Sequence, residues 1–448
     1  MREVIYILFI SLGISCSPKL QSPVVELPEE YTYCDDCSAE GYPIEERWWE
    51  IFDNAKLNEA VQIALDNNRD LAAALANVEA ARNHVRVAKA EFLPSLYFGA
   101  EVEAYRINGE TTQEYSATPA IKWELSLFGK LRNSRNAAIA EYLSKEWGYR
   151  AAILSLTADV LTTIFTLNQY QQSYQIAQRS YQLRREATAL VDSMYRYGMS
   201  DGVVLQQALS MVFSAQSEMV KYQRAVAQTQ LALNLLLGQN SSYELPDFSF
   251  GHTSLPSVPV GIPSDLLERR PDVMESYYAV SSAAYDVGVA RASRFPSFTL
   301  TADGGFVIET LKDLSSAKPI GWSIVGELTQ PIFNFGALKS SEQVYTQEYI
   351  AAMNSYEQSI LSALSDVETS LVDISTYRQE LLLAHSLVEA NAKIAESTAA
   401  LYARGLGNYL SVIDAQRELY ASQIDYQELL TQQYINYVSL VKSLGGGF

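Results

Sequence analysis

The side chains best suited to catalysis or metal binding are few in this sequence and far apart along it. Its three histidines, His84, His252 and His385, lie in unrelated segments and show no metal-ligand spacing. No G-x-S-x-G motif or phosphate-binding loop accompanies them. We therefore expect no catalytic residue, no bound metal and no cofactor, and we do not expect an enzyme.

Two of the three cysteines, Cys34 and Cys37, form a C-x-x-C motif in an acidic, tyrosine-rich segment. A redox dithiol would require a βαβ context, and a zinc site would require two further ligands. The sequence supplies neither. Because an exported protein can form disulfides, a local disulfide between these two cysteines is the preferred interpretation.

The third cysteine, Cys16, follows a segment typical of export. Arg2 precedes the apolar stretch Val4–Ile14, which is too short to span a bilayer and fits a signal peptide over residues 1–15. The following Gly13-Ile14-Ser15-Cys16 resembles a bacterial lipobox, although glycine stands where leucine is usual. We therefore predict that Cys16 carries lipid and begins a flexible tether over 16–47. The alternative is an ordinary signal peptide with an incidental cysteine.

The bulk composition excludes two broad classes of protein. The chain has 448 residues, of which 48% are hydrophobic and 19% charged, so it is not disordered as a whole. Its net charge of −19 argues against nucleic acid as a partner, because phosphate binding requires a basic surface. Outside the N-terminal segment no run of 18 apolar residues occurs, so we expect no transmembrane helix. Any membrane span would then consist of strands.

Three sequence landmarks occur twice in the same order, at an offset of 202 to 207 residues. They pair Lys89–Leu96 with Arg291–Phe298, Phe128–Leu131 with Phe335–Leu338, and Tyr195–Ala208 with Tyr402–Ala415. This is the signature of a duplication. We assign the two repeats to residues 48–238 and 263–448, with a Gly-, Pro- and Ser-rich linker over 239–262.

Each repeat is predicted to contain a helix, a strand pair, a very long helix and a further long helix after a turn. The first helices are expected over 57–91 and 263–294, and the very long ones over 133–194 and 341–401. About 60 helical residues reach roughly 90 Å. Helices of that length are typical of coiled coils or of a tube wall and are not needed in a compact core.

Four segments of about ten residues each alternate apolar and polar side chains with a period of two. We expect strands at about 95–105, 116–128, 297–309 and 319–331, joined by surface loops over 106–115 and 310–318. Their length suits tilted transmembrane strands. The charged positions expected to share the inward face are Glu101, Glu103, Lys122, Glu124, Asp303 and Glu327.

Four strands cannot close a barrel, and an open edge in hydrocarbon would leave backbone groups unpaired at several kcal/mol each. Eight strands from two copies would fill their own interior with side chains, whereas twelve could leave a lumen. Because the charged inward positions require water, we predict a twelve-stranded barrel built by a homotrimer.

Several motifs are shared with a known family. They are Trp48–Phe52, Asn68–Leu71, Trp123–Leu131, Ile262–Asp272, Asp414–Arg417 and Leu444–Phe448. On these motifs the chain resembles the TolC family of outer-membrane factors from Trp48 to Phe448, closest to its OprM-like and NodT-like lipoprotein branch. The resemblance implies an α+β membrane protein. In it a trimeric twelve-stranded β-barrel in the outer-membrane lipid is continued by a long periplasmic α-helical barrel.

The resemblance also implies partners and sites. Family members bind a periplasmic adaptor protein and an inner-membrane pump, here expected to be of the RND class. The adaptor would bind the two helix-to-helix turns, whose matching residues are Tyr195, Gly198, Asp201, Tyr402, Gly405 and Asn408. Asp414 matches one ring of gate aspartates, and Ser411 stands where a second aspartate would be. The alternative for Asp414 is an ordinary solvated surface residue.

The function implied is passive conduction of small molecules from pump and adaptor to the exterior. A type I protein-secretion duct is an alternative with the same fold. A periplasmic coiled-coil scaffold without a pore is an alternative of a different class, and it would require the four alternating segments to be soluble strands.

Overall fold

The computed structural model describes residues 28, 31–33, 47–107, 109–243, 263, 269–308 and 321–446. The predicted signal peptide 1–15, Cys16, Cys34, Cys37 and most of the linker 239–262 lie outside these residues. The chain divides into two compact units, and each draws on both sequence repeats. The sheet unit contains Leu75–Gly148 and Asp272–Ser359, and the helical unit contains Glu26–Ala74, Tyr149–Pro271 and Ile360–Phe448.

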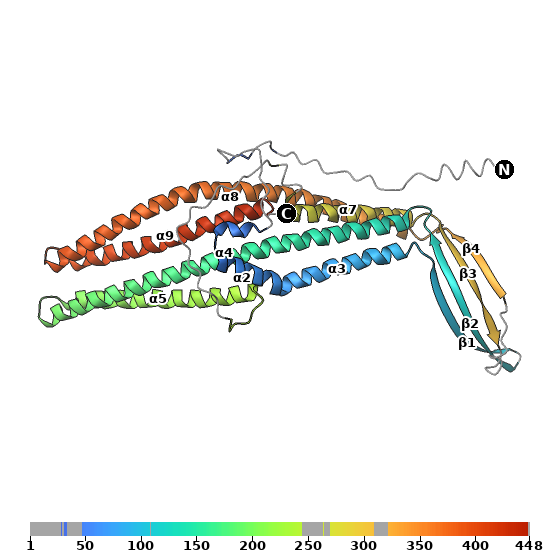
Figure 1. The fold of residues 1–448 in the computed structure, drawn as a ribbon, viewed down its shortest axis with the longest axis horizontal. Helices are drawn as coiled ribbons and strands as arrows, with labels where there is room; N and C mark the ends of the chain where they lie inside the picture. The colour runs from blue at the N-terminus through green and yellow to red at the C-terminus, as the bar shows by residue number, and fades with distance from the viewer. Residues whose placement is uncertain are drawn as a thin grey trace. The chain divides into compact units, whose positions relative to one another are not determined.

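The sheet unit is built around four antiparallel strands in the order β1-β2-β3-β4 (Figure 1). They are β1 (Ser95–Ile107), β2 (Glu110–Leu125), β3 (Ser297–Ile308) and β4 (Gly321–Thr329). All four predicted strands are present. The predicted loop over 106–115 is wrong, because both strands continue to a turn at Gly109, whose φ is 91°. Thr111 and Thr112, β-branched residues that favour strands, pair there with Arg106 and Tyr105. The predicted loop over 310–318 lies outside the described residues.

The helices repeat in length as well as in order. Before and after the strands lie η1 (Trp48–Phe52), α2 (Ala55–Asn67), α3 (Arg69–Ala90), α4 (Lys130–Arg196), α5 (Gly202–Leu236), α7 (Pro271–Ala292), α8 (Ala337–Ala403) and α9 (Tyr409–Ser443). The pairs α3 and α7, α4 and α8, and α5 and α9 have 22, 67 and 35 residues in both repeats. The two very long helices match the predicted ranges to within four residues at each end.

The expectation of one continuous helix over 57–91 is wrong. Asn68 has extended backbone angles (φ −63°, ψ 127°) and separates α2 from α3. Its side-chain oxygen accepts hydrogen bonds from the backbone N–H groups of Asp70 and Leu71, both at 3.0 Å, which is a helix N-cap. The helix expected over 263–294 is interrupted in the same way. Arg270 is not helical, and α7 begins at Pro271, which has no N–H to leave unsatisfied in a first turn.

The core of the helical unit joins η1, α2, α4, α5 and α9. The predicted apolar stripe of α4 supplies its centre, because Val160 and Ile164 are fully buried. Phe165 beside them lies 5.1 Å, ring centre to ring centre, from both Phe52 and Tyr434. Aromatic contacts of this kind add to the free energy of burial. The long helices are thus held together by side-chain packing along their length.

One described helix, α4, contains an 18-residue window that is long and apolar enough to cross a membrane, and half of that window is buried. Length and composition alone therefore identify one candidate where the sequence predicted none. Buried core helices of soluble proteins meet the same criterion, and the α4 stripe packs into the core described above. The window is weak evidence for a membrane span.

Candidate functional site

One face of the sheet carries the charged side chains that the alternation predicted. Side chains of directly opposite residues point to the same side of a sheet. The pairings place Glu124, Thr299 and Glu327 in one cross-strand row. By the same registers the other predicted positions, Glu101, Glu103, Lys122 and Asp303, fall on this polar face. The structure therefore brings all six predicted residues onto one surface.

Two of these carboxylates have direct partners in the sheet unit. Glu124 forms an ion pair with Lys130 at 3.2 Å, and Asp303 accepts a hydrogen bond of 2.6 Å from the Ser323 hydroxyl. Ser323 lies directly opposite Asp303 in the ladder. The polar face is thus acidic and internally hydrogen-bonded, as suits a surface in contact with water.

The opposite face of the sheet is apolar and exposed. Leu96, Ile121, Ala302 and Ile324 form one cross-strand row on it. Leu96 is 76% exposed, and Trp322, two residues before Ile324, is 79% exposed. A contiguous apolar surface of this kind on a folded chain marks contact with membrane or protein.

The sheet has two free edges among the described residues. β1 pairs only with β2, and β4 pairs only with β3. Unpaired edge strands present rows of N–H and C=O groups that can pair with another chain. The sheet of one copy is therefore an open segment.

Two tight reversals join the long helices to their return helices, at equivalent places in the repeats. Gly198 and Gly405 have φ values of 72° and 73°, the left-handed region that favours glycine. Around Gly198, the N–H of Met199 donates to the Met194 carbonyl at 2.8 Å, and Leu406 donates to Leu401 at 3.0 Å in the second repeat. Both are Schellman-type helix ends, so the sequence-predicted glycines have the backbone role expected of them.

The residues after each reversal cap the return helix. Asp201 accepts from the Val204 N–H at 3.0 Å, and Asn408 accepts from the Ser411 N–H at 2.8 Å. The Ser411 hydroxyl also donates to the Asn408 side chain at 3.1 Å. Ser411, which the sequence placed beside a gate, is therefore engaged in the cap of α9.

Asp414 lies on the exposed side of α9, one turn after Ser411, which is also exposed. Its neighbours Val412 and Ile413 are buried in a small core with Val191 of α4. The helix therefore presents Asp414 to solvent and its apolar face to protein. Arg417 follows one turn later on the same exposed side, a cation beside Asp414 that the sequence analysis did not weigh.

The tyrosines of the reversals differ in environment. Tyr402 and Tyr409 contact each other with ring centres 5.2 Å apart, and both join the core at this end of the helical unit. Burial raises the pKa of both hydroxyls. Tyr195 is exposed. Of the predicted turn residues, the structure thus assigns Tyr402 to packing and leaves Tyr195 at the surface.

A buried arginine in the same part of the helical unit was not singled out from the sequence. Arg184 of α4 is buried, donates to the Met211 carbonyl of α5 at 3.3 Å, and lies over the ring of Tyr420 of α9. Burial lowers the pKa of its guanidinium. Asn391, 207 residues later, donates to the equivalent carbonyl, that of Glu418, at 3.4 Å. The duplication is the signal that relates these two polar contacts.

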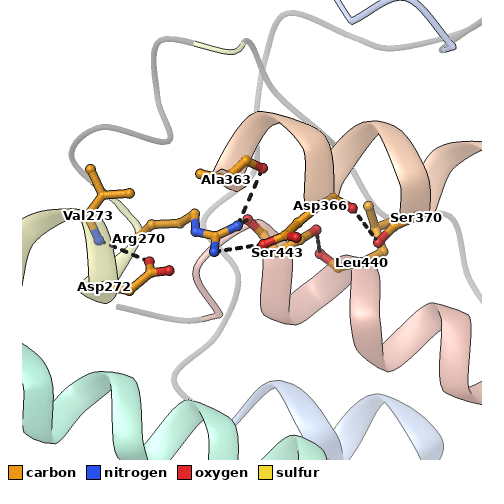
Figure 2. Close-up of polar contacts among 8 residues, drawn as sticks. All are labelled: Arg270, Asp272, Val273, Ala363, Asp366, Ser370, Leu440 and Ser443. Carbon is orange, nitrogen blue, oxygen red and sulfur yellow. Dashed lines mark hydrogen bonds and ion pairs between the residues drawn. The ribbon is translucent and has the colours of Figure 1, made fainter. Parts of the chain in front are cut away.

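Arg270 holds the end of α9 in the helical unit (Figure 2). Its guanidinium donates to the Ser443 carbonyl at 3.2 Å and to the Ala363 carbonyl at 3.4 Å, and it pairs with Asp366 at 3.0 Å. Ser443 is the last residue of α9, so its carbonyl is among those a helix cannot satisfy itself. In the first repeat the Asn68 amide donates to the carbonyl of Leu236, the last residue of α5, at 3.0 Å.

A glycine follows each of these helix ends and passes close to the chain before the next short helix. A Cβ at Gly238 would lie 2.3 Å from the Asn67 carbonyl oxygen, and one at Gly445 would lie 2.7 Å from that of Arg269. Both glycines also have positive φ. The two helix ends are therefore built alike, from a polar side chain and a close glycine.

In the part of the chain that the structure describes, no three His, Cys, Asp or Glu side chains come together in a way that could hold a metal ion.

Comparison with known proteins gives a consistent result. The model of the family described as outer membrane efflux protein matches residues 60–239 and 262–446. The chain is 30% identical to the probable efflux pump outer membrane protein TtgC of Pseudomonas putida, over 98% of this chain and 94% of the relative. It is 33% identical to the solvent efflux pump outer membrane protein SrpC of the same species, over 89% of this chain and 87% of the relative.

Solved structures agree with the sequence matches. A membrane protein from Pseudomonas aeruginosa superposes with a TM-score of 0.85 at 28% identity, covering 97% of this chain and 98% of that one. The open state of the MtrE outer membrane channel of Neisseria gonorrhoeae gives 0.82 at 26% identity, covering 96% and 98%. The predicted TolC-like fold is thereby confirmed.

Proposed function

This chain belongs to the outer membrane efflux protein family, and from that premise we propose how its sheet, helix turns and N-terminal region serve a channel. It is the outer-membrane channel component of an efflux system. The observation that carries the mechanism is the open four-stranded sheet with one charged face and one apolar face. Conduction is passive in this proposal, so an inner-membrane pump supplies the energy.

Three copies close one barrel of twelve strands. Each copy contributes β1 to β4, the free edges pair between copies, the apolar face contacts lipid, and the polar face lines the lumen. The acidic side chains on the polar face support the lumen assignment, since ionised carboxylates are costly to bury without water. A twelve-stranded barrel is wide enough for such a lumen.

Planar-bilayer recording tests the channel directly. Purified protein should run as a heat-modifiable trimer and should give discrete ion conductance. A trimer that gave no conductance under any voltage or ionic condition would favour a scaffold without a pore. Charge reversal of Glu101 and Glu327 to lysine should shift the reversal potential toward anion selectivity, because both line the proposed lumen. Leu96→Ala on the opposite face is the matched control and should leave selectivity unchanged.

The transported class is small organic molecules in this proposal, and the names of relatives from Pseudomonas putida support it, because they describe solvent and toluene efflux. A knockout strain should become more sensitive to aromatic solvents, and the wild-type gene should restore tolerance. If the knockout instead lost a secreted protein and kept solvent tolerance, the type I secretion alternative would be favoured.

The helix-to-helix turns are the proposed docking site for a periplasmic adaptor, which links the channel to a pump of the RND class. The two equivalent Schellman turns at Gly198 and Gly405 support this, since they give two equivalent rigid loops with exposed side chains such as Tyr195. Replacing Tyr195 by Glu should abolish adaptor pulldown without loss of the trimer. Leu183→Glu, at an exposed position on α4 away from the turn, is the matched control. Unchanged pulldown with the Tyr195 variant would contradict the docking site.

Asp414 is the proposed gate residue, with Ser411 as the neighbouring ring position. Three copies of an exposed carboxylate around one axis would focus negative potential and favour cations. Asp414→Asn should therefore reduce cation selectivity while Ser411→Ala should change it little, because Ser411 already bonds within its own helix cap. Equal selectivity in the wild type and the Asp414 variant would make this residue an ordinary surface carboxylate.

Lipid attachment at Cys16 and a disulfide between Cys34 and Cys37 complete the proposal for the N-terminal region. Mass spectrometry of the mature N-terminal peptide should show an acylated cysteine. Cys16→Ser should then leave export intact but abolish the added mass. Alkylation before and after reduction should show Cys34 and Cys37 protected only in the unreduced sample.

A further inference from the structure

The segment after β4 exposes large apolar side chains in a strained backbone. Ile332 is 94% exposed and Phe335 is 92% exposed. Phe335 also has a φ of 52°, a left-handed conformation that is rare for a bulky side chain. Such conformations persist where surrounding structure determines them. Within one chain, the ring of Phe335 contacts only its neighbour Phe333 among the described aromatic pairs, at 4.6 Å.

The first repeat shows where the equivalent side chain packs. Phe128, 207 residues before Phe335, stacks on Phe295 with ring centres 5.0 Å apart and planes at 15°. Phe128 follows β2, and Phe295 immediately precedes β3, the strand that pairs with β2. The contact is thus part of the β2–β3 junction.

The second repeat has both halves of the same contact, but on opposite edges of the sheet. The residue equivalent to Phe295 is Leu93, 202 residues earlier, which precedes β1 and is 66% exposed. Phe335 follows β4. Because the strand order is β1-β2-β3-β4, the two edges that carry Leu93 and Phe335 can meet only between different copies of the chain.

We propose that Phe335 of one copy packs on Leu93 of the next copy, and that β4 pairs with the next copy's β1 in the register that β2 makes with β3. The inference rests on the proposed trimeric channel and specifies its interface. It makes every junction around the sheet equivalent, with the internal duplication supplying the pattern.

The duplication fixes the register numerically. The β1–β2 pair Ser95–Lys122 becomes Ser297–Thr329 when the offsets of 202 and 207 residues are applied, and this is a pair found in β3–β4. The β2–β3 pair Ile121–Ala302 then becomes Leu328 opposite Ala100 of the next copy.

This register also keeps the faces in step. Leu328 and Ala100 both belong to the apolar face, and Glu327 and Glu101, which become opposite each other, both belong to the polar face. A slip of one residue would place Leu328 opposite Glu101 and exchange the faces.

Cysteine cross-linking tests the register in the full-length chain with Cys34→Ser and Cys37→Ser and with Cys16 retained. Leu328→Cys combined with Ala100→Cys should give covalent dimers and trimers on non-reducing gels after mild oxidation. Each single variant is the control for cross-links through Cys16. Ile121→Cys with Ala302→Cys, the equivalent pair within one chain, should oxidise without forming covalent oligomers.

A pair shifted along the strand tests the register itself. Leu328→Cys with Phe98→Cys displaces one Cα by roughly 6.6 Å, beyond disulfide reach, so cross-linking should fall on the order of tenfold. Glu327→Cys with Glu101→Cys is a second matched pair and should cross-link as well as the first. A shifted pair that cross-links as well as the matched pairs would overturn the register.

Bilayer conductance separates this inference from the proposed function. Absent cross-links in matched pairs overturn the interface, whether or not the oligomer conducts. Efficient cross-links in an oligomer that gives no conductance support the interface while the proposed channel fails.

The aromatic contact has its own test, the temperature at which the SDS-resistant oligomer dissociates. Phe335→Ala and Leu93→Ala should each lower it by several degrees, and the double variant should be no worse than the more affected single variant. Phe128→Ala, at the equivalent contact within one chain, is the matched control and should leave the Phe335→Ala effect unchanged. Additive effects of Leu93→Ala and Phe335→Ala would show that the two side chains do not touch.

Discussion

The end of α9 offers a sharp test of how Arg270 stabilises the helical unit. The Arg270 side chain is almost fully buried, whereas its ion-pair partner Asp366 is 53% exposed. A half-exposed ion pair contributes at most about 1 kcal/mol. Leaving the buried Ser443 carbonyl without its donor costs roughly 1–3 kcal/mol. The structure therefore predicts that Arg270 acts mainly through the helix-terminal carbonyl and less through the ion pair.

The variants follow from that division. Arg270→Met keeps most of the side-chain volume but removes every donor, and it should weaken the local stability of the last turn of α9 by about 2–3 kcal/mol. Asp366→Asn removes only the charge and should cost no more than about 1 kcal/mol. Arg270→Lys, with one ammonium in place of the planar guanidinium, should fall between them.

Hydrogen–deuterium exchange of the α9 C-terminal amides in the intact oligomer measures the effect where it arises. A local loss of 2–3 kcal/mol corresponds to exchange about 30- to 150-fold faster, since each 1.4 kcal/mol is a factor of ten. Asn68→Asp is a matched control at the other helix end. It keeps the acceptor that caps α3 but loses the donor to Leu236, so exchange should rise at the end of α5 and not at α9. An Asp366→Asn effect as large as that of Arg270→Met would refute the reasoning, because it would assign the stabilisation to the ion pair.

Two further predictions concern the two units separately. Gly238→Ala places a Cβ 2.3 Å from the Asn67 carbonyl oxygen at a φ of 65°, so it should lower the free energy of unfolding by roughly 2 kcal/mol or more and lower the melting temperature followed by circular dichroism. In the sheet unit, burial, reinforced by Glu141 and Glu348, raises the pKa of Asp286 from 3.8 to about 6. Since the folded state then binds more protons than the unfolded state between about pH 4 and pH 6, stability should fall as pH rises through that window. Asp286→Asn should remove this dependence and stabilise the protein by about 1 kcal/mol at pH 8, after allowance for solvent screening of a half-exposed group, with no gain at pH 4. A pH profile unchanged by the substitution would contradict the assignment.

The sequence by itself determined the elements and their repetition. Helix and strand periods are local properties, so the two very long helices and the four strands could be read from the spacing of apolar residues. The alternation also placed six charged residues on one face, because successive side chains in a strand point to opposite sides. The turn glycines, Gly198 and Gly405, could be predicted for the same reason, since φ > 0 at a helix end is a local requirement.

Only the tertiary structure decided how the helices end and what holds them. The break at Asn68 could have been read from the Asn68-Arg69-Asp70 cap, but the surrounding alanines favour a continuous helix. The reason for the break lies 168 residues away, where the Asn68 amide satisfies the Leu236 carbonyl. Arg270 similarly reaches Ser443, 173 residues further on. Periodicity carries no information about contacts of that range.

The same limit applies to residues whose function depends on burial or on another copy of the chain. Ser411 was assigned beside a gate from a sequence match, and only the coordinates show that its hydroxyl is committed to the α9 cap. Arg184 reads as one more surface cation in the sequence, yet the packing of α4, α5 and α9 buries it. Phe335 lies beside a recurring landmark, but its exposure, its positive φ and the missing ring beneath it emerge only when the two repeats are superposed in three dimensions. The sequence encodes the repeated unit, and the physical reason that the unit must meet its own kind lies in the sheet edges that folding leaves open.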